Sequence, residues 1–227
     1  MTLLARPDLV LIDLDGTLVD SVPDLCVAVN LMRADLGLDP QPQQQIAGYV
    51  GNGIDRLIHR SLTGNFTDEA QAVKFAKAQH QFTSHYAQHN GRHSRLYPGV
   101  VEGIGQLLAA GIQLACVTNK STRFSEQLLQ AFGIRSYFAM LVAGDTTAFK
   151  KPHPQPLLHA AQTLGKSSSE CLMIGDSVHD VEAARAAQMA VVAVSYGYNH
   201  GDDIGTAKPD AVIGRLDQFA GLTTLTL

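Results

Sequence analysis

The sequence has few of the features that hold small secreted proteins together or carry a chain into a membrane. Its 227 residues include three cysteines and no tryptophan. The cysteines, Cys26, Cys116 and Cys171, lack the paired spacing of a metal or redox motif. No apolar run reaches the length of a membrane span, and the first residues do not resemble a secretion signal. We therefore expect a cytoplasmic protein with reduced, packed cysteines.

Positive charge is also scarce. The chain has 17 lysines and arginines against 21 aspartates and glutamates, which gives a formal net charge of −4 and a pI near 6.1. A nucleic-acid-binding surface requires an excess of basic residues, so we expect neither a nucleic-acid nor a membrane partner. The length suits one large domain, or one domain that carries a smaller inserted one.

Strands and helices are predicted to alternate after residue 96. Apolar runs predict strands, and segments of helical periodicity that end at glycine predict the helices between them. The expected strands are residues 9–12, 113–117, 140–143, 171–174, 191–194 and 211–213, and the helices are 101–110, 124–132, 154–164 and 181–187. This alternation predicts an α/β fold, a Rossmann-like open parallel sheet with helices on both faces.

Residues 20–92 follow a different pattern, in which only helices are expected. A helix is predicted to start at Ser21, a second helical segment covers residues 46–62 with glycine interruptions, and a third runs from a cap at Thr67 to about Gln88. We interpret this stretch as an inserted α-helical cap domain, residues 20–92, and assign residues 1–19 and 93–227 to an α/β core domain.

Two carboxylates follow the first predicted strand. Leu9-Val10-Leu11-Ile12 is typical of a strand buried on both faces, and the chain continues as Asp13-Leu14-Asp15-Gly16. Burying two acids is costly without a partner, and a hard divalent cation is the obvious one. The alternative, a polar turn that ends the strand, is the better interpretation of Asp-Gly alone.

Polar residues also follow the other predicted strands. Thr118 and Asn119 come after the second strand, Lys151 lies beyond the third, and Asp176 and Asp180 follow the fourth. Taken singly, each is a common turn, surface or helix-start residue. Ligands of open α/β sheets bind outside the carboxyl ends of the strands, so the joint placement predicts one site for an anion and a cation.

These residues carry a family resemblance. Asp13-Leu14-Asp15-Gly16-Thr17-Leu18 resembles the first motif of the haloacid dehalogenase superfamily, the magnesium-dependent phosphotransferases and phosphatases with an aspartate nucleophile. The continuation through Leu25 resembles the phosphoglycolate phosphatase branch. Thr118 resembles the second motif of the superfamily, Lys151 in Lys-Pro-His-Pro the third, and Asp176 with Asp180 the fourth.

The resemblance implies a role for each residue. Asp13 would attack phosphorus, and Asp15 would protonate the leaving group and then activate water. Mg²⁺ would be held by the Asp13 carboxylate, the Asp15 carbonyl and Asp176, with Asp180 in support, directly or through water. Lys151 and Thr118 would offset the charge of the phosphoryl oxygens, and the amide of Asn119 would contact them.

The resemblance also extends to the predicted cap domain, which would contact the part of the substrate beyond the phosphate. Tyr49-Val50-Gly51-Asn52-Gly53 resembles the cap loop of phosphoglycolate phosphatases, and we predict substrate contacts from Gly51, Asn52 and Arg56. The expected partner is a small phosphomonoester, 2-phosphoglycolate above all. The alternatives are a phosphotransferase that resembles β-phosphoglucomutase, another small-metabolite phosphatase, and a non-catalytic relative that binds phosphoryl ligands. Both a monomer and a homodimer are compatible with the sequence.

Overall fold

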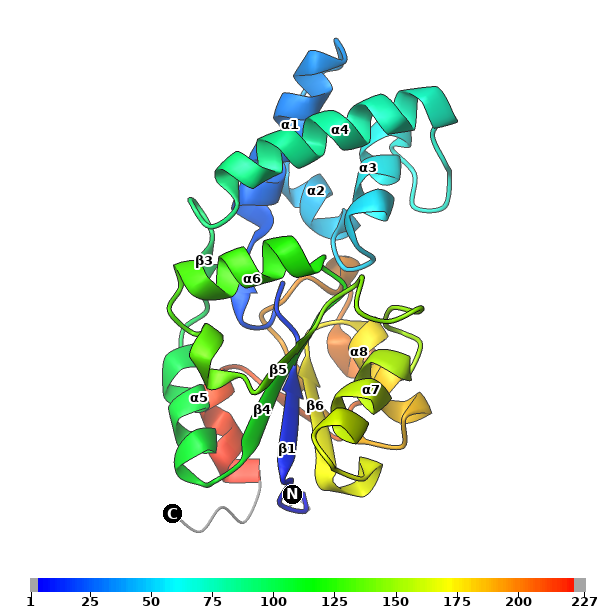
Figure 1. The fold of residues 1–227 in the computed structure, drawn as a ribbon. Coiled ribbons are helices and arrows are strands. Elements are labelled where there is room, and N and C mark those ends of the chain that lie inside the picture. The colour runs from blue at the N-terminus through cyan, green and yellow to red at the C-terminus, as the bar shows by residue number, and fades with distance from the viewer. Residues whose placement is uncertain (1–3, 223–227) are drawn as a thin grey trace.

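The computed structural model describes residues 4–222, and its centre is a six-stranded sheet (Figure 1). The strands are β1 (Leu9–Ile12), β4 (Gln113–Val117), β5 (Met140–Val142), β6 (Cys171–Gly175), β7 (Ala190–Val194) and β8 (Ala211–Ile213). They pair in the order β5-β4-β1-β6-β7-β8, and every pairing is parallel. The predicted Rossmann-like sheet is therefore confirmed.

Helices cover both faces of the sheet. Successive side chains of a strand point to opposite faces, so Val10 and Ile12 enter one apolar cluster and Leu9 and Leu11 the other. The first cluster includes residues of α5 (Val100–Ala109) and α6 (Thr122–Ala131), and the second includes residues of α7 (Gln155–Thr163) and α8 (Val178–Ala186). Short 3₁₀ helices lie at Arg135–Tyr137, Ser168–Glu170, Asn199–Gly201, Ile204–Ala207 and Leu216–Leu222.

Four helices are inserted between two short strands. The helices are α1 (Val22–Asp35), α2 (Gln43–Tyr49), α3 (Ile54–Thr63) and α4 (Ala72–His89). They lie beyond the carboxyl ends of the sheet strands and pack around a third apolar cluster that contains Phe82 and Tyr86 (Figure 1). The flanking strands, β2 (Val19–Asp20) and β3 (Arg95–Leu96), form an antiparallel ribbon. This helical segment therefore has its own core.

Buried polar contacts fix the two ends of the helical segment. The fully buried Asp24 carboxylate accepts backbone hydrogen bonds from Gly91 (2.8 Å), His93 (2.7 Å) and Ser94 (3.0 Å). At the start of α1, the Tyr198 hydroxyl accepts the N–H groups of Ser21 and Val22 at 2.8 and 3.1 Å. The tyrosine thus satisfies two of the first donors of α1, whereas the Ser21 side chain, predicted as a cap, makes no capping hydrogen bond.

Some predicted boundaries need correction. Helix α4 begins at Ala72 rather than beside Thr67, because the Asn65 side chain accepts hydrogen bonds from the Thr67 N–H (3.0 Å) and hydroxyl (3.1 Å) and forms a separate turn. Helix α8 begins at Val178, three residues before the predicted start. The domain limits stay a prediction, and the ends of the predicted core, residues 1–3 and 223–227, lie outside the described residues.

Within residues 4–222, no helix combines the length and the hydropathy that a membrane crossing requires.

Candidate active site

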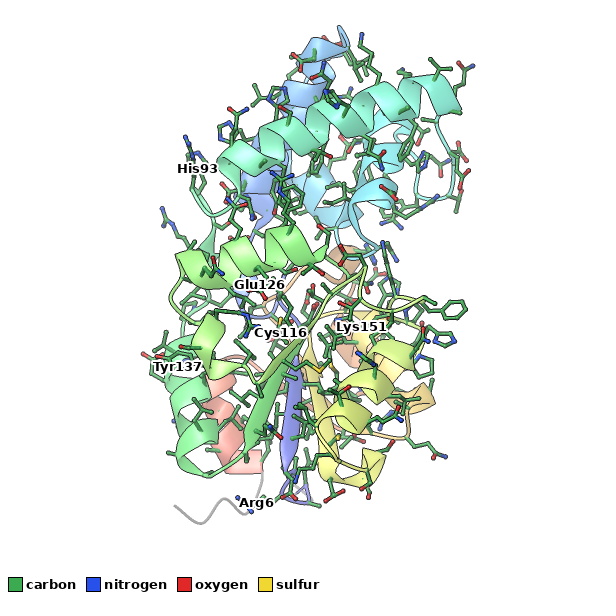
Figure 2. The ribbon with its side chains drawn as sticks, viewed as in Figure 1. Arg6, His93, Cys116, Glu126, Tyr137 and Lys151 are labelled. Carbon is green, nitrogen blue, oxygen red and sulfur yellow. The ribbon has the colours of Figure 1, made fainter. Side chains whose placement is uncertain are left out.

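The carboxyl ends of β1, β4 and β6 bring the predicted residues together. Strand β1 pairs with both β4 and β6, so Asp13, Thr118 and Asp176, which follow these strands directly, become neighbours. Lys151 reaches the same place from the loop before α7, at the end of the sheet that faces the helical segment (Figure 2). The side chains of Asp13, Asp176 and Lys151 are buried. Four residues that are remote in sequence therefore share one site.

Three carboxylates and one ammonium group form the centre of this site. One oxygen from each of Asp13, Asp176 and Asp180 lies within 4.8 Å of the others. The Lys151 ammonium lies 2.9 Å from Asp13 Oδ1 and donates to Asp180 Oδ1 (2.6 Å) and the Val117 carbonyl (2.7 Å). One ammonium group thus faces three buried carboxyl groups.

This imbalance fits a divalent cation. Burial raises the pKa of Asp13 to about 7, with Lys151 opposing the shift and Asp180 adding to it. Burial and the carboxylates of Asp180 and Asp13 raise the pKa of Asp176 to about 8. Asp13 Oδ1 is buried and accepts no hydrogen bond of acceptable geometry, despite its ion pair with Lys151. A hard divalent ion would balance the charge of the deprotonated acids and bind the Asp13 carboxylate.

Neighbouring groups hold the two later carboxylates in place. Asp176 accepts hydrogen bonds from the Thr17 hydroxyl (3.0 Å) and the Tyr198 N–H (2.8 Å), one on each oxygen. Asp180 Oδ2 accepts the N–H (3.1 Å) and hydroxyl (2.8 Å) of Ser177, while its Oδ1 accepts Lys151. Both oxygens of Asp180 therefore already serve to orient Lys151 and the start of α8.

Glycines leave the space that these carboxylates fill. A Cβ on Gly16, where φ is +88°, would lie 2.3 Å from Asp176 Oδ2, and one on Gly197 would lie 2.1 Å from the Asp176 Cβ. A Cβ on Gly175 would lie 2.2 Å from the Asp180 Cγ. Side chains are excluded at these distances, so the backbone must approach the acids as glycine. Gly16 belongs to the motif that was recognised in the sequence, whereas no sequence pattern indicated a role for Gly197.

A second ion pair in the site was not predicted. The buried Lys120 ammonium lies 3.0 Å from each oxygen of Asp15 and donates to the Tyr86 hydroxyl at 2.6 Å. Tyr86 belongs to α4, so this contact joins the helical segment to the sheet. Lys120 directly follows Thr118 and Asn119 at the end of β4. Its position next to these two predicted site residues could have indicated that it also belongs to the site.

Thr118 and Asn119 have different surroundings. Thr118 lines a small cavity together with Asp13 and Asp15, as expected of a group that contacts the phosphoryl oxygens. The amide of Asn119 is occupied by protein: it donates to the carbonyls of Gly51 and Lys151, both at 2.9 Å, and accepts the Lys151 N–H at 3.0 Å. In this structure Asn119 positions Lys151 and the loop before α3.

The predicted contacts from the helical segment are only partly in place. Gly51 lines the cavity, whereas the Asn52 side chain turns aside to His179 Nε2 at 2.8 Å. Arg56 does not line the cavity: its guanidinium donates to the Phe66 carbonyl (2.7 Å) and pairs with Glu69 (3.6 Å). Ile54 and Leu57, which are three positions apart, face the cavity, and the intervening Arg56 points elsewhere in this structure. The substrate contact of Arg56 stays a prediction.

A wider cleft of about 510 Å³ lies beside the cavity, between the helical segment and the start of α6. The two spaces share Ile54 and Asn119. The cleft is lined mainly by polar and charged side chains, among them Asp55, Gln79, His80, Arg123, Asp145 and Lys150. The cleft therefore borders the cavity with side chains of both charges.

Comparisons with known proteins agree with this geometry. Residues 10–194 match the model of the haloacid dehalogenase-like hydrolase family. Phosphoglycolate phosphatases are 46% identical in Nitrosococcus oceani (97% of this chain, 98% of that protein) and 43% identical in Thiobacillus denitrificans (95% of each). A crystal structure described as a predicted phosphoglycolate phosphatase from Haemophilus somnus superposes with a TM-score of 0.89, at 34% identity over 94% of this chain and 96% of that one.

Proposed function

The chain belongs to the haloacid dehalogenase-like hydrolases, and we propose that it hydrolyses the phosphate ester of 2-phosphoglycolate through an aspartyl-phosphate on Asp13. The observation that supports this proposal most strongly is the meeting of Asp13, Thr118, Lys151 and Asp176 at one edge of the sheet. A nucleophile, a cationic partner and an acidic cluster are the groups that phosphoryl transfer requires. The cytoplasmic location stays a prediction.

The first chemical step uses Asp13 and Asp15. A carboxylate oxygen of Asp13 forms a bond to phosphorus while the bond from phosphorus to the ester oxygen breaks. The departing oxygen takes its proton from Asp15, which lies in the same cavity. In the second step a water molecule attacks the phosphorus, gives its proton to Asp15 and releases Asp13 and inorganic phosphate. Two easier displacements thus replace one difficult hydrolysis.

Positive groups stabilise the charge on the transferring phosphoryl group. Lys151 is fixed beside Asp13 by Asp180 and the Val117 carbonyl, so its ammonium is oriented before the substrate arrives. Thr118 offers a hydroxyl from the lining of the cavity that contains Asp13. Asp13, Asp176 and the Asp15 carbonyl would hold Mg²⁺, which supplies further positive charge to the phosphoryl oxygens when bound.

The relatives support the choice of substrate. Two proteins that carry the name phosphoglycolate phosphatase share 46% and 43% of their residues with this chain over nearly its full length. Val50, Gly51 and Ile54 of the helical segment line the cavity beside Asp13, and this suits a short leaving group.

The test is phosphate release from 2-phosphoglycolate by the purified protein, with Mg²⁺ and after treatment with EDTA. We expect turnover only with the metal, and Asp13→Asn should lower kcat by at least about 10³-fold because the nucleophile is lost. Asp68→Asn, at an exposed position far from the cavity, is the matched control and should retain wild-type rates. Turnover retained by Asp13→Asn would rule out the proposal.

A further inference from the structure

We propose that Lys120 receives the carboxylate of the leaving group and thereby selects acidic phosphomonoesters over neutral ones. This inference rests on the proposed phosphatase function and adds the residue that determines its specificity. It assigns a role to a cation that the phosphoryl chemistry described above does not use.

Lys120 occupies the right position for this role. Its ammonium contacts both oxygens of Asp15 at 3.0 Å, and Asp15 marks the place of the ester oxygen to which it donates a proton. The carboxylate of 2-phosphoglycolate lies one carbon away from that oxygen. A cation beside Asp15 is therefore adjacent to the position that this carboxylate takes when the phosphorus faces Asp13.

The cavity offers no other cation to the leaving group. Of the described residues that line it, Lys120 alone carries a positive charge, and the residues contributed by the helical segment are apolar or glycine. The lining consists of Asp13, Asp15, Leu25, Val50, Gly51, Gly53, Ile54, Leu57, Thr118, Asn119 and Lys120. A carboxylate buried in these surroundings without a cationic partner would be strongly destabilised.

The nearby cations outside this lining have other contacts or positions. The Lys151 ammonium is held by Asp13, Asp180 and a backbone carbonyl. The Arg60 guanidinium donates to the carbonyls of Tyr49 (2.8 Å) and Phe66 (3.2 Å) within the helical segment. Arg123 and Lys150 are exposed and line the outer cleft. Lys120 is thus the one that can contact a short leaving group.

Tyr86 keeps Lys120 in reach of the cavity. Its hydroxyl accepts a hydrogen bond from the ammonium at 2.6 Å, and the ammonium lies 4.8 Å from the centre of its ring. The side chain of Lys120 is 3% exposed, so bulk water screens its charge weakly. A substrate carboxylate can share the ammonium with Asp15, whereas a methyl group in that place cannot.

The test compares 2-phosphoglycolate with ethyl phosphate, in which a methyl group replaces the carboxylate. We expect wild-type kcat/KM to favour 2-phosphoglycolate, and Lys120→Met to reduce this preference by at least about 10-fold, mainly through KM for the acidic ester. Lys120→Arg keeps the charge and should retain most of the preference. Lys74→Met, at an exposed position of α4 that lines neither the cavity nor the outer cleft, is the matched control and should leave the preference unchanged.

Two outcomes separate this inference from the proposed function. If Lys120→Met lowers kcat/KM for both esters equally, Lys120 serves only to position Asp15, and the inference is wrong while the phosphatase proposal stands. If the wild-type protein does not hydrolyse 2-phosphoglycolate, the proposed function itself fails. If circular dichroism shows that Lys120→Met does not fold, Lys120→Gln replaces it. The same ratio of kcat/KM for 2-phosphoglycolate to kcat/KM for ethyl phosphate then decides the test.

Discussion

Asp24 shows how one buried carboxylate can fix the path of the chain. It lies in the first turn of α1, yet it accepts three N–H groups from residues 91–94, where the chain returns from the helical segment. Asp24 is fully buried, so its removal leaves buried space and deprives these three donors of their acceptor. The residue therefore acts on stability rather than on chemistry.

We expect Asp24→Ala to lower the free energy of unfolding by about 3 kcal/mol, since buried donors lose their acceptor. Urea unfolding followed by circular dichroism measures this change. Asp68→Ala removes an exposed carboxylate and should change the free energy of unfolding by less than about 0.5 kcal/mol. Equal stability of the two variants would show that the contacts of Asp24 contribute little.

Single residues were predictable where the backbone alone decides their position. Asp13, Thr118 and Asp176 directly follow strands, so the rule for carboxyl ends of a parallel sheet was sufficient to bring them together. Asn52 and Arg56 depend on the direction of side chains in a loop and on a helix, and the structure turns both away from the cavity. The direction of Arg56 depends on the phase of α3, and that of Asn52 on the loop before this helix; neither can be derived from strand ends.

At the scale of elements, the loops after β1, β6 and β7 are packed against one another through glycine. Gly16 and Gly197, from the first and third of these loops, both approach Asp176 so closely that no Cβ fits. The Tyr198 N–H, next to Gly197, also donates to Asp176. The position of this acid is therefore set by two loops besides its own.

Gly197→Ala should displace Asp176 and raise the Mg²⁺ concentration for half-maximal activity by about 10-fold, as expected when the support of a metal ligand is lost. Titration of phosphatase activity with Mg²⁺ provides the measurement. Gly105→Ala, in α5 with open space around the new Cβ, is the matched control and should not change the titration. An unchanged midpoint in Gly197→Ala would refute the role of this glycine.

Elements differ in how far their sequence defines them. Continuous apolar runs predicted all six strands of the sheet within one residue at each end, because these strands are buried on both faces. The predicted start of α4 at Thr67 was wrong because Asn65 and Thr67 form a side-chain turn whose residue types resemble those of a helix cap. Local polar turns carry the same residue types as caps, and only the fold distinguishes them.

At the scale of the whole molecule, the acidic cluster should make stability depend on pH in an unusual direction. The pKa values of Asp13 and Asp176, about 7 and about 8, lie above the ordinary value of 3.8. The folded state thus binds protons that the unfolded chain releases, and raising the pH removes stability. The penalty is absent below about pH 4 and grows until about pH 8.

We therefore expect the melting temperature measured in EDTA to fall as the pH rises from about 4 to about 8, and the increase produced by Mg²⁺ to grow over the same range. Thermal unfolding at several pH values, with and without Mg²⁺, measures both trends. Asp176→Asn should weaken the pH dependence, and Asp68→Asn should not. A Mg²⁺ effect that is independent of pH would contradict this account.

The ribbon of β2 and β3 has a consequence for how such a molecule can diversify. Its pairing of Val19 with Leu96 and Asp20 with Arg95 places the entry and exit of the helical segment side by side. A short connection between Asp20 and Arg95 could close the chain without moving any strand of the sheet. Evolution can therefore exchange or enlarge the segment as a replaceable module, and the phosphate chemistry is inherited intact while new leaving groups are accommodated.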